Sequence, residues 1–320
     1  MLGPIENLEA YLNANIIGQA EAARSIDTVI KRTFPAEGKP SLSKAGRPYG
    51  TFLFLGPTGT GKTEITRCAC RYLFSEPDAH EDSTAWEGRF FRFDMSEYQL
   101  QESVRILLGE SRAQQGLLGD AIDRGNEAGG GVLLFDEIEK AHPQVLKLFL
   151  GLNDAARVTM TTGETKCADR FYLVSTSNLG SAQAIQMDAS FYASMKRHVL
   201  QTARKHLSPE VFARMGEKIV FNKLSYENQL TICRNMLANE LRHIGRKIRR
   251  NITATEDVFK VLVKLGFDKY LGARPMRDAI ERAIGNVVAD WMLANKNWQA
   301  GNSPLVIEVA AENLVIRELQ

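Results

Sequence analysis

Residues 52–64 read Phe-Leu-Phe-Leu-Gly-Pro-Thr-Gly-Thr-Gly-Lys-Thr-Glu. The apolar first part is typical of a fully buried strand, and residues 56–63 match the pattern Gly-x-x-x-x-Gly-Lys-Ser/Thr in full. Glycines in such a loop let backbone N–H groups wrap a phosphate, and the N-terminus of the following helix adds its positive dipole. The sequence therefore predicts a nucleotide-phosphate loop made of Gly56, Pro57, Thr58, Gly59, Thr60, Gly61, Lys62 and Thr63.

Two positions in this loop have predicted chemical roles. Lys62 would reach the β- and γ-phosphates, and the Thr63 hydroxyl would bind Mg²⁺. An acidic pair, Asp136 and Glu137, ends a second apolar run at residues 132–135. Because a buried parallel strand presents its last residues at the carboxyl edge of the sheet, Asp136 would hold Mg²⁺ through its water shell, and Glu137 would orient and deprotonate the attacking water. Taken alone, the acidic pair could equally cap the next helix.

Short apolar runs alternate with helix-length stretches over the first two thirds of the chain. This alternation is typical of βαβ units and a parallel sheet, and the predicted strands are residues 51–55, 90–93, 132–135 and 171–175. The sequence before them indicates two helices between residues 4 and 31, broken at 16–19, and then a loop at 35–48. The fold class is therefore α/β, a P-loop NTPase sheet flanked by helices.

The composition changes near Asn222. Helical patterns follow, with one strand-like run near the end, at residues 226–250, 256–265, 275–295 and 305–309. We therefore predict a large nucleotide-binding domain at residues 1–222 and a smaller, mainly helical domain at 223–320.

Composition restricts the class of protein. The chain has 320 residues, enough for about two domains, and no apolar run approaches the ~18 residues that a membrane span needs. The N-terminus lacks the basic-then-apolar order of a signal peptide, and a net charge of +2 does not require nucleic acid as a partner. The four cysteines form no Cys-x-x-Cys pair, which favours a reducing cytoplasm.

Several motifs in a fixed order resemble the AAA+ superfamily, and within it the second nucleotide-binding module of Clp-type chaperones and unfoldases. They are Ile-Ile-Gly-Gln at 16–19, the phosphate loop, FDMSEY at 93–98, LLFDEIEKAHP at 133–143, TSNLGS at 176–181 and GARPMR at 272–277. The resemblance implies an ATPase that uses ATP and Mg²⁺ and assembles as a homo-oligomeric ring, a hexamer. The first ring and middle domain of the large members are absent, so we expect a single-ring or stand-alone relative.

The resemblance also implies roles for individual residues. Asn178 corresponds to sensor 1, which helps to hold the lytic water, and could alternatively cap a turn. Arg214 has the arginine-finger position, although Ala213-Arg214-Met215-Gly216 stands where relatives usually have Asn-Arg-Ile-Asp. Arg274 corresponds to sensor 2 and would contact the γ-phosphate, a surface ion pair being the alternative. Ile16 and Ile17 would line the adenine pocket or be plain core residues.

One segment departs from the family. Residues 109–119 contain no aromatic side chain, whereas threading unfoldases carry a Gly-Tyr-Val-Gly pore loop there. Residues 75–88 resemble an inserted polar loop. The basic stretch at 242–250 favours a solvated helix face, with a phosphate-backbone contact as the alternative.

These features predict an ATP-driven ring protein that remodels protein complexes, with an unknown protein client or adaptor. Two alternatives stay open: an AAA+ ATPase that acts on nucleic acid, as a loader or transposition regulator, and a nucleotide-gated scaffold. The near-neutral charge and the chaperone-like motifs oppose the nucleic-acid alternative.

Overall fold

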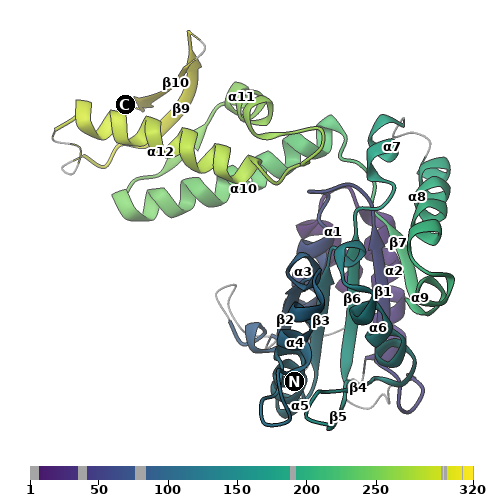
Figure 1. Cartoon of the computed structure of the whole chain (residues 1–320). Helices are drawn as coiled ribbons and strands as arrows, with labels where there is room; N and C mark the ends of the chain where they lie inside the picture. Colours follow the sequence, from purple (N-terminus) through teal and green to yellow (C-terminus); the bar gives the residue numbers. More distant parts are fainter. Residues whose placement is uncertain are drawn as a thin grey trace. The chain divides into compact units, whose positions relative to one another are not determined.

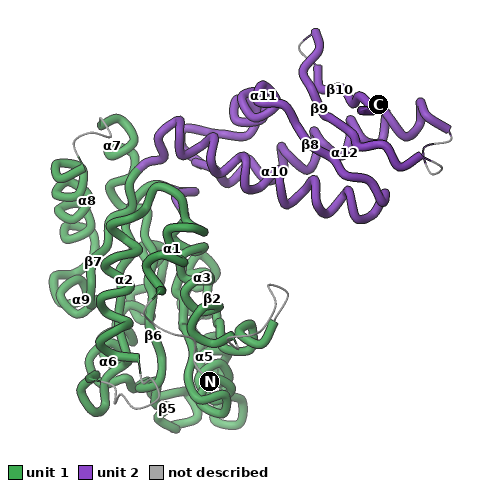
Figure 2. The backbone as a smooth tube through the Cα atoms, turned by 180° about the vertical axis from the view of Figure 1, so that it is seen from behind, with its two compact units in different colours: residues 1–57, 61–222 green, residues 58–60, 223–320 purple. Residues whose placement is uncertain are grey.

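A computed structural model describes residues 7–34, 42–75, 84–187, 192–296, 298, 301–311 and 313–319. The predicted loops at 35–48 and 75–88 lie partly outside these residues. The chain divides into two compact units, residues 1–57 with 61–222 and residues 58–60 with 223–320 (Figure 2). Each unit is described by itself.

The first unit is built on a five-stranded parallel sheet with the order β2-β3-β6-β1-β7 (Figure 1). The strands are β1 (Gly50–Leu55), β2 (Phe90–Asp94), β3 (Gly131–Asp136), β6 (Phe171–Ser177) and β7 (Glu217–Val220). The first four confirm the predicted strands and the α/β fold class. The sequence analysis missed β7, because Glu-Lys-Ile-Val is too short and too polar at its start to stand out as an apolar run.

Alternate residues of each central strand enter two different cores, because successive side chains of a strand point to opposite faces. In β3, Leu133 and Phe135 join one core, whereas Val132 and Leu134 join the other. Since both faces are buried, the strand reads as a continuous apolar run in the sequence.

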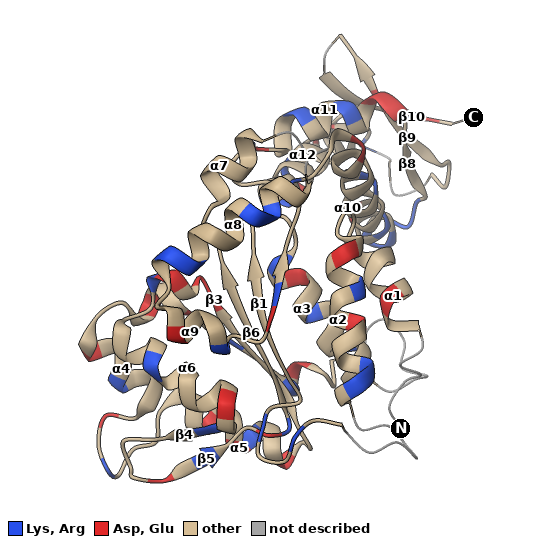
Figure 3. Ribbon diagram, turned by 90° about the vertical axis from the view of Figure 1, so that its right-hand side faces the viewer, with Lys and Arg blue, Asp and Glu red and all other residues tan. Residues whose placement is uncertain are grey.

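Helices cover both faces of the sheet, and Figure 3 shows the strands between them. One face packs against α1 (Leu8–Asn15), α2 (Ala20–Thr33) and α3 (Lys62–Phe74). The other face packs against α4 (Gln101–Leu108), α5 (Leu117–Glu127), α6 (Pro143–Ala155), α7 (Ser181–Gln186), α8 (Tyr192–His206) and α9 (Pro209–Arg214). The smaller elements are the hairpin of β4 (Arg157–Thr159) and β5 (Thr165–Cys167), and the 3₁₀ turns η2 (Glu87–Arg89), η3 (Met95–Tyr98) and η4 (Ile138–Lys140).

In the residues that the structure describes, the second unit combines three α-helices with a three-stranded sheet. The helices are α10 (Tyr226–Ile248), α11 (Glu256–Gly266) and α12 (Met276–Ala294). The sheet has the order β10-β9-β8, formed by β8 (Ile252–Ala254), β9 (Leu305–Ala310) and β10 (Asn313–Glu318). Their shared core includes Leu237, Leu262 and Ile284. Of the sheet, only the part at 305–309 was predicted. None of the described helices is both long and apolar enough to cross a membrane.

Candidate nucleotide site

The phosphate loop connects β1 to α3, and its glycines adopt backbone conformations that other residues avoid. Gly56 has φ 131° and Gly61, directly before α3, has φ 101°. A Cβ atom at Gly56 would lie 2.6 Å from the carbonyl oxygen of Phe221, so no larger residue fits there. The glycines thus allow the tight turn that points the first N–H groups of α3 toward the loop.

Lys62, the first residue of α3, is buried. Its Nζ donates hydrogen bonds to the carbonyl oxygens of Gly56 (2.7 Å) and Pro57 (2.8 Å), and to Oδ1 of Asn178 (2.8 Å). The ammonium group therefore lies against the start of the phosphate loop and beside the end of β6. If a phosphate oxygen replaced one of these neutral acceptors, the ammonium group would donate to a charged acceptor, and that hydrogen bond would be stronger.

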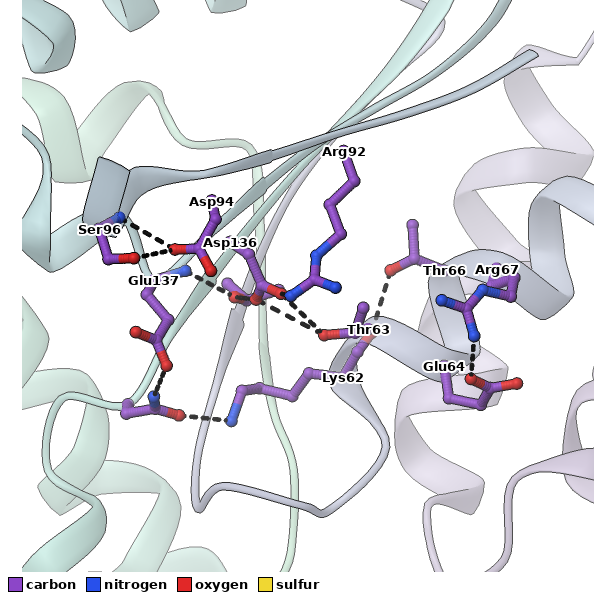
Figure 4. A network of polar contacts seen from close by, with 12 residues as sticks. Lys62, Thr63, Glu64, Thr66, Arg67, Arg92, Asp94, Ser96, Asp136 and Glu137 are labelled. Carbon is purple, nitrogen blue, oxygen red and sulfur yellow. Dashed lines mark hydrogen bonds and ion pairs between the residues drawn. The ribbon is translucent and has the colours of Figure 1, made fainter. Parts of the chain in front are cut away.

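The Asp136 carboxylate ends β3 and is held by three side chains (Figure 4). Its Oδ2 accepts a hydrogen bond from the Thr63 hydroxyl (3.2 Å) and pairs with Nη2 of Arg92 (2.7 Å). Its Oδ1 accepts a hydrogen bond from the Thr176 hydroxyl. Because the Asp136 side chain is only 8% exposed, its carboxylate needs such partners, since an unpaired buried charge is costly.

Glu137 follows β3 in a left-handed conformation, with φ 56°. Its backbone N–H donates to the Thr176 hydroxyl (3.1 Å), and its Oε1 accepts a hydrogen bond from Nδ2 of Asn178 (3.3 Å). The other carboxylate oxygen pairs with Lys140, and this hydrogen bond raises the pKa of Lys140. Since Oδ1 of Asn178 also accepts a hydrogen bond from Nζ of Lys62, the Asn178 amide connects Lys62 to Glu137; both of these residues are labelled in Figure 4.

Thr63 and Asp136 supply the hard oxygen atoms that Mg²⁺ prefers. The part of the chain that the structure describes contains no group of three or more His, Cys, Asp or Glu residues able to hold a metal ion. Two protein oxygens fit Mg²⁺ all the same, because this ion usually keeps several waters and takes its other ligands from phosphates. These two oxygen donors would therefore suit a metal that is bound together with a nucleotide.

Two hydrogen bonds attach the turn between α1 and α2 to the backbone of Asn222, which follows β7. Gln19 is buried, donates from Nε2 to the carbonyl of Asn222 (2.9 Å), and accepts at Oε1 from the Asn222 N–H (3.0 Å). Ile16 is also buried, and a Cβ atom at Gly61 would lie 3.2 Å from its Cγ2. Ile16 thus adjoins the phosphate loop, whereas Ile17 is partly exposed. The adenine-pocket role of both isoleucines stays a prediction.

Comparison with known proteins identifies the family. The model of the AAA domain (Cdc48 subfamily) matches residues 47–218, and that of the C-terminal, D2-small domain of ClpB protein matches residues 224–303. The chain belongs to the ClpB-type AAA+ family. This confirms the resemblance to the C-terminal module of Clp-type chaperones.

Three relatives illustrate the coverage of this family. "Chaperone protein ClpB 1" of Synechococcus elongatus is 34% identical over 96% of this chain, and "Chaperone protein ClpB" of Dichelobacter nodosus is 34% identical over 91%. The chain spans about one third of the length of each of them, 33% and 32%. "Probable chaperone protein ClpB 1" of Chlorobaculum tepidum is 32% identical over 96% of this chain, which spans 68% of that relative.

The AAA+ resemblance assigned two arginines to the site, and the structure gives the partners of one of them. Arg214 ends α9 and pairs with Asp154 of α6 (2.5 Å) and with Glu210 (3.2 Å). Its side chain is 40% exposed. Arg274 is an exposed residue of the second unit. Both assignments stay predictions.

Arg92 and Thr176 were not predicted as site residues. β2 reads Phe-Phe-Arg-Phe-Asp, and Arg92 is its only basic residue. The Arg92 side chain is 39% exposed and β2 is an edge strand, so its charge alone requires no partner, and the sequence carried no signal for its ion pair with Asp136. Thr176 offers no such signal, because a hydroxyl inside a buried strand can bond to its own backbone or to any neighbour.

Proposed function

We propose that this protein is a Mg²⁺-dependent ATPase that works as a homo-oligomeric ring and remodels protein complexes. The observation that carries the proposal is the Asn178 amide, which contacts both the Lys62 ammonium and the Glu137 carboxylate at the carboxyl edge of the sheet. A phosphate-binding cation and a general base within reach of one amide are what ATP hydrolysis requires. The cytoplasmic location and the unknown protein client or adaptor stay predictions.

The chain's own residues divide the work of hydrolysis. Lys62 binds the β- and γ-phosphates, while Thr63 and Asp136 hold the metal. Bound Mg²⁺ supplies charge neutralisation at the phosphate oxygens. Glu137 accepts a proton from the attacking water at its carboxylate, and Asn178 keeps that carboxylate and the water in line. Arg92 and Thr176 fix the orientation of Asp136.

The proposed ring assembly follows if Arg214 acts on the nucleotide of a neighbouring subunit, because the active site would then lie between two subunits. Within its own chain Arg214 pairs with Asp154 and Glu210, so it would exchange those carboxylates for the γ-phosphate of the neighbouring subunit. An arginine in that position stabilises transition-state charge and is worth about 10³–10⁵ in rate where measured.

We therefore expect inactive Arg214→Ala subunits and inactive Glu137→Gln subunits to regain ATPase activity when mixed. In a random mixture, about a quarter of the interfaces of a closed ring would combine an intact Glu137 with an intact Arg214. Phosphate release by the mixture measures this. Mixing Arg204→Ala, an exposed arginine on α8, with Glu137→Gln controls for simple dilution. An Arg214→Ala protein that is fully active alone, or whose mixture stays silent, would contradict the trans role.

The segment between α4 and α5 supports remodelling without threading. The loop comprises residues 109–116, with a bridge between Ser111 and Gln114. We predicted a loop to residue 119, but residues 117–119 already form the first turn of α5. Leu118 is buried and Leu117 is 50% exposed, so of these two leucines only Leu117 could contact a passing chain. The loop therefore offers no aromatic ring to hold a passing chain.

ATP hydrolysis is accordingly expected without unfolding of a stably folded, tagged model substrate. Without an aromatic side chain, the loop would make few apolar contacts with an arbitrary chain during each ATP-driven movement. The force would therefore act on a docked partner instead. The test is fluorescence of a folded reporter during ATP turnover, with ATP consumption measured in the same sample. ATP-dependent global loss of reporter fluorescence would refute the proposal, and a Leu117→Ala variant would then show whether Leu117 provides the grip.

A further inference from the structure

The second unit contains a groove of about 600 Å³ between α10 and β8. Its floor is apolar and includes Leu237, Leu241 and Ile252, which are themselves part of the core of this unit. Phe259 of α11 borders it. None of the residues predicted to bind nucleotide lines this groove.

The rim of the groove is basic. Arg234, Arg242, Arg246 and Arg249 line it and are all exposed, and no Asp or Glu is among the lining residues, each of which the structure describes. Arg234 pairs with Glu256, whereas Arg242 bonds to the neutral Asn239. Within the described ranges, Arg246 and Arg249 form no ion pair.

The fifth arginine of the groove has a structural role. Arg250 is buried, pairs with Glu318 (2.9 Å), and donates to the carbonyl of Trp298 (2.6 Å). Its guanidinium also lies over the Trp291 ring, 5.1 Å from the centroid. The prediction that the whole basic stretch is a solvated helix face is therefore wrong at Arg250, and the remaining arginines form the exposed rim. Figure 3 shows the basic residues of α10 in blue.

The spacing of the rim suits an extended chain. Arg234, Ala238, Arg242 and Arg246 lie at four-residue intervals on one face of α10, so each step is about 6 Å along the helix. In an extended peptide, alternate side chains repeat about every 6.6 Å. The opposite wall is β8, an edge strand of its sheet, and edge strands offer unpaired backbone groups to an added strand.

We propose that this groove binds an extended acidic segment of a partner protein, with carboxylates at alternate positions facing Arg242 and Arg246. Bidentate pairing of guanidinium and carboxylate would fix the register, and the apolar floor would bury the aliphatic parts of the segment. The apolar floor would not stabilise a charged phosphate backbone. The chain's net charge of +2 is also too small to attract nucleic acid in general. These two observations favour a peptide over nucleic acid.

The test measures binding of fluorescein-labelled peptides to the full chain by anisotropy. The probe alternates four Glu with four Val residues, and a peptide of the same composition with the four Glu in one block controls for charge alone. We expect the alternating peptide to bind more tightly than the block peptide. The double variant Arg242→Glu/Arg246→Glu should weaken this binding by at least about tenfold.

The matched control is Lys264→Glu/Arg282→Glu, which makes the same charge change at exposed residues outside the groove; it should change binding less than about twofold. Equal binding of both peptides, or equal losses in both double variants, would overturn the proposal. So would displacement of the peptide by a 20-nucleotide oligothymidylate at lower concentration than by unlabelled peptide, which would assign the groove to phosphate. Loss of self-association in Arg242→Glu/Arg246→Glu without any peptide binding would assign it to a second copy of the chain.

Discussion

A Glu137→Gln variant should bind ATP with Mg²⁺ about as tightly as the parent protein but hydrolyse it about 10²–10⁴-fold more slowly. The substitution keeps the size of the side chain and leaves an oxygen that can accept the hydrogen bond from Asn178 (3.3 Å in the parent). It removes the carboxylate that would take the proton from water. Nucleotide affinity measured by a fluorescent ATP analogue, and turnover measured by phosphate release, separate the two effects.

Lys140 gives this experiment an internal control. Its ammonium pairs with the other carboxylate oxygen of Glu137, so a Lys140→Met variant removes the ion pair and leaves the general base. We expect such a variant to retain most of its turnover, since a pair with a half-exposed lysine contributes little. Parent-like turnover in Glu137→Gln would mean that another group activates the water.

A Lys62→Ala variant is expected to lose nucleotide affinity by at least about 100-fold. The ammonium would make charge-assisted hydrogen bonds to two phosphates, and about 1.5 kcal/mol for each gives a total near 3 kcal/mol. Titration with ATP in the presence of Mg²⁺, followed by calorimetry, measures the loss.

Folding must be controlled in this variant, because Lys62 also donates to Gly56, Pro57 and Asn178 in the protein itself. Thermal unfolding without nucleotide reports how much of the loss comes from a disturbed loop. Lys147→Ala on α6, an exposed lysine, is the matched control and should bind ATP normally. Unchanged affinity in Lys62→Ala at parent-like thermal stability would remove the phosphate loop from the proposed function.

The tertiary structure shows the burial of side chains that the sequence could not predict, because their burial depends on packing. Leu117 and Leu118 are the same residue type, yet one is half exposed and the other buried, because α5 begins there and its 3.6-residue period turns Leu118 toward the core and Leu117 toward solvent. Arg250 ends a run of arginines and lysines, but only the fold brings Glu318 and Trp291 to it. Contacts over such sequence distances leave no local pattern.

The sequence by itself determined the elements whose signals are local. The glycine spacing of the phosphate loop, the apolar runs of β1, β3 and β6, and the acidic pair after β3 follow from backbone sterics and from burial on both faces, which neighbouring residues express directly. Only the tertiary structure decided the partners of the charged groups. Arg92 meets Asp136 because β2 and β3 pair in parallel, and Asn178 lies between Lys62 and Glu137 because three strand ends meet at one edge of the sheet. A side chain's burial and its ion pair depend on elements far away in the chain, and the residue type records only that some partner is needed.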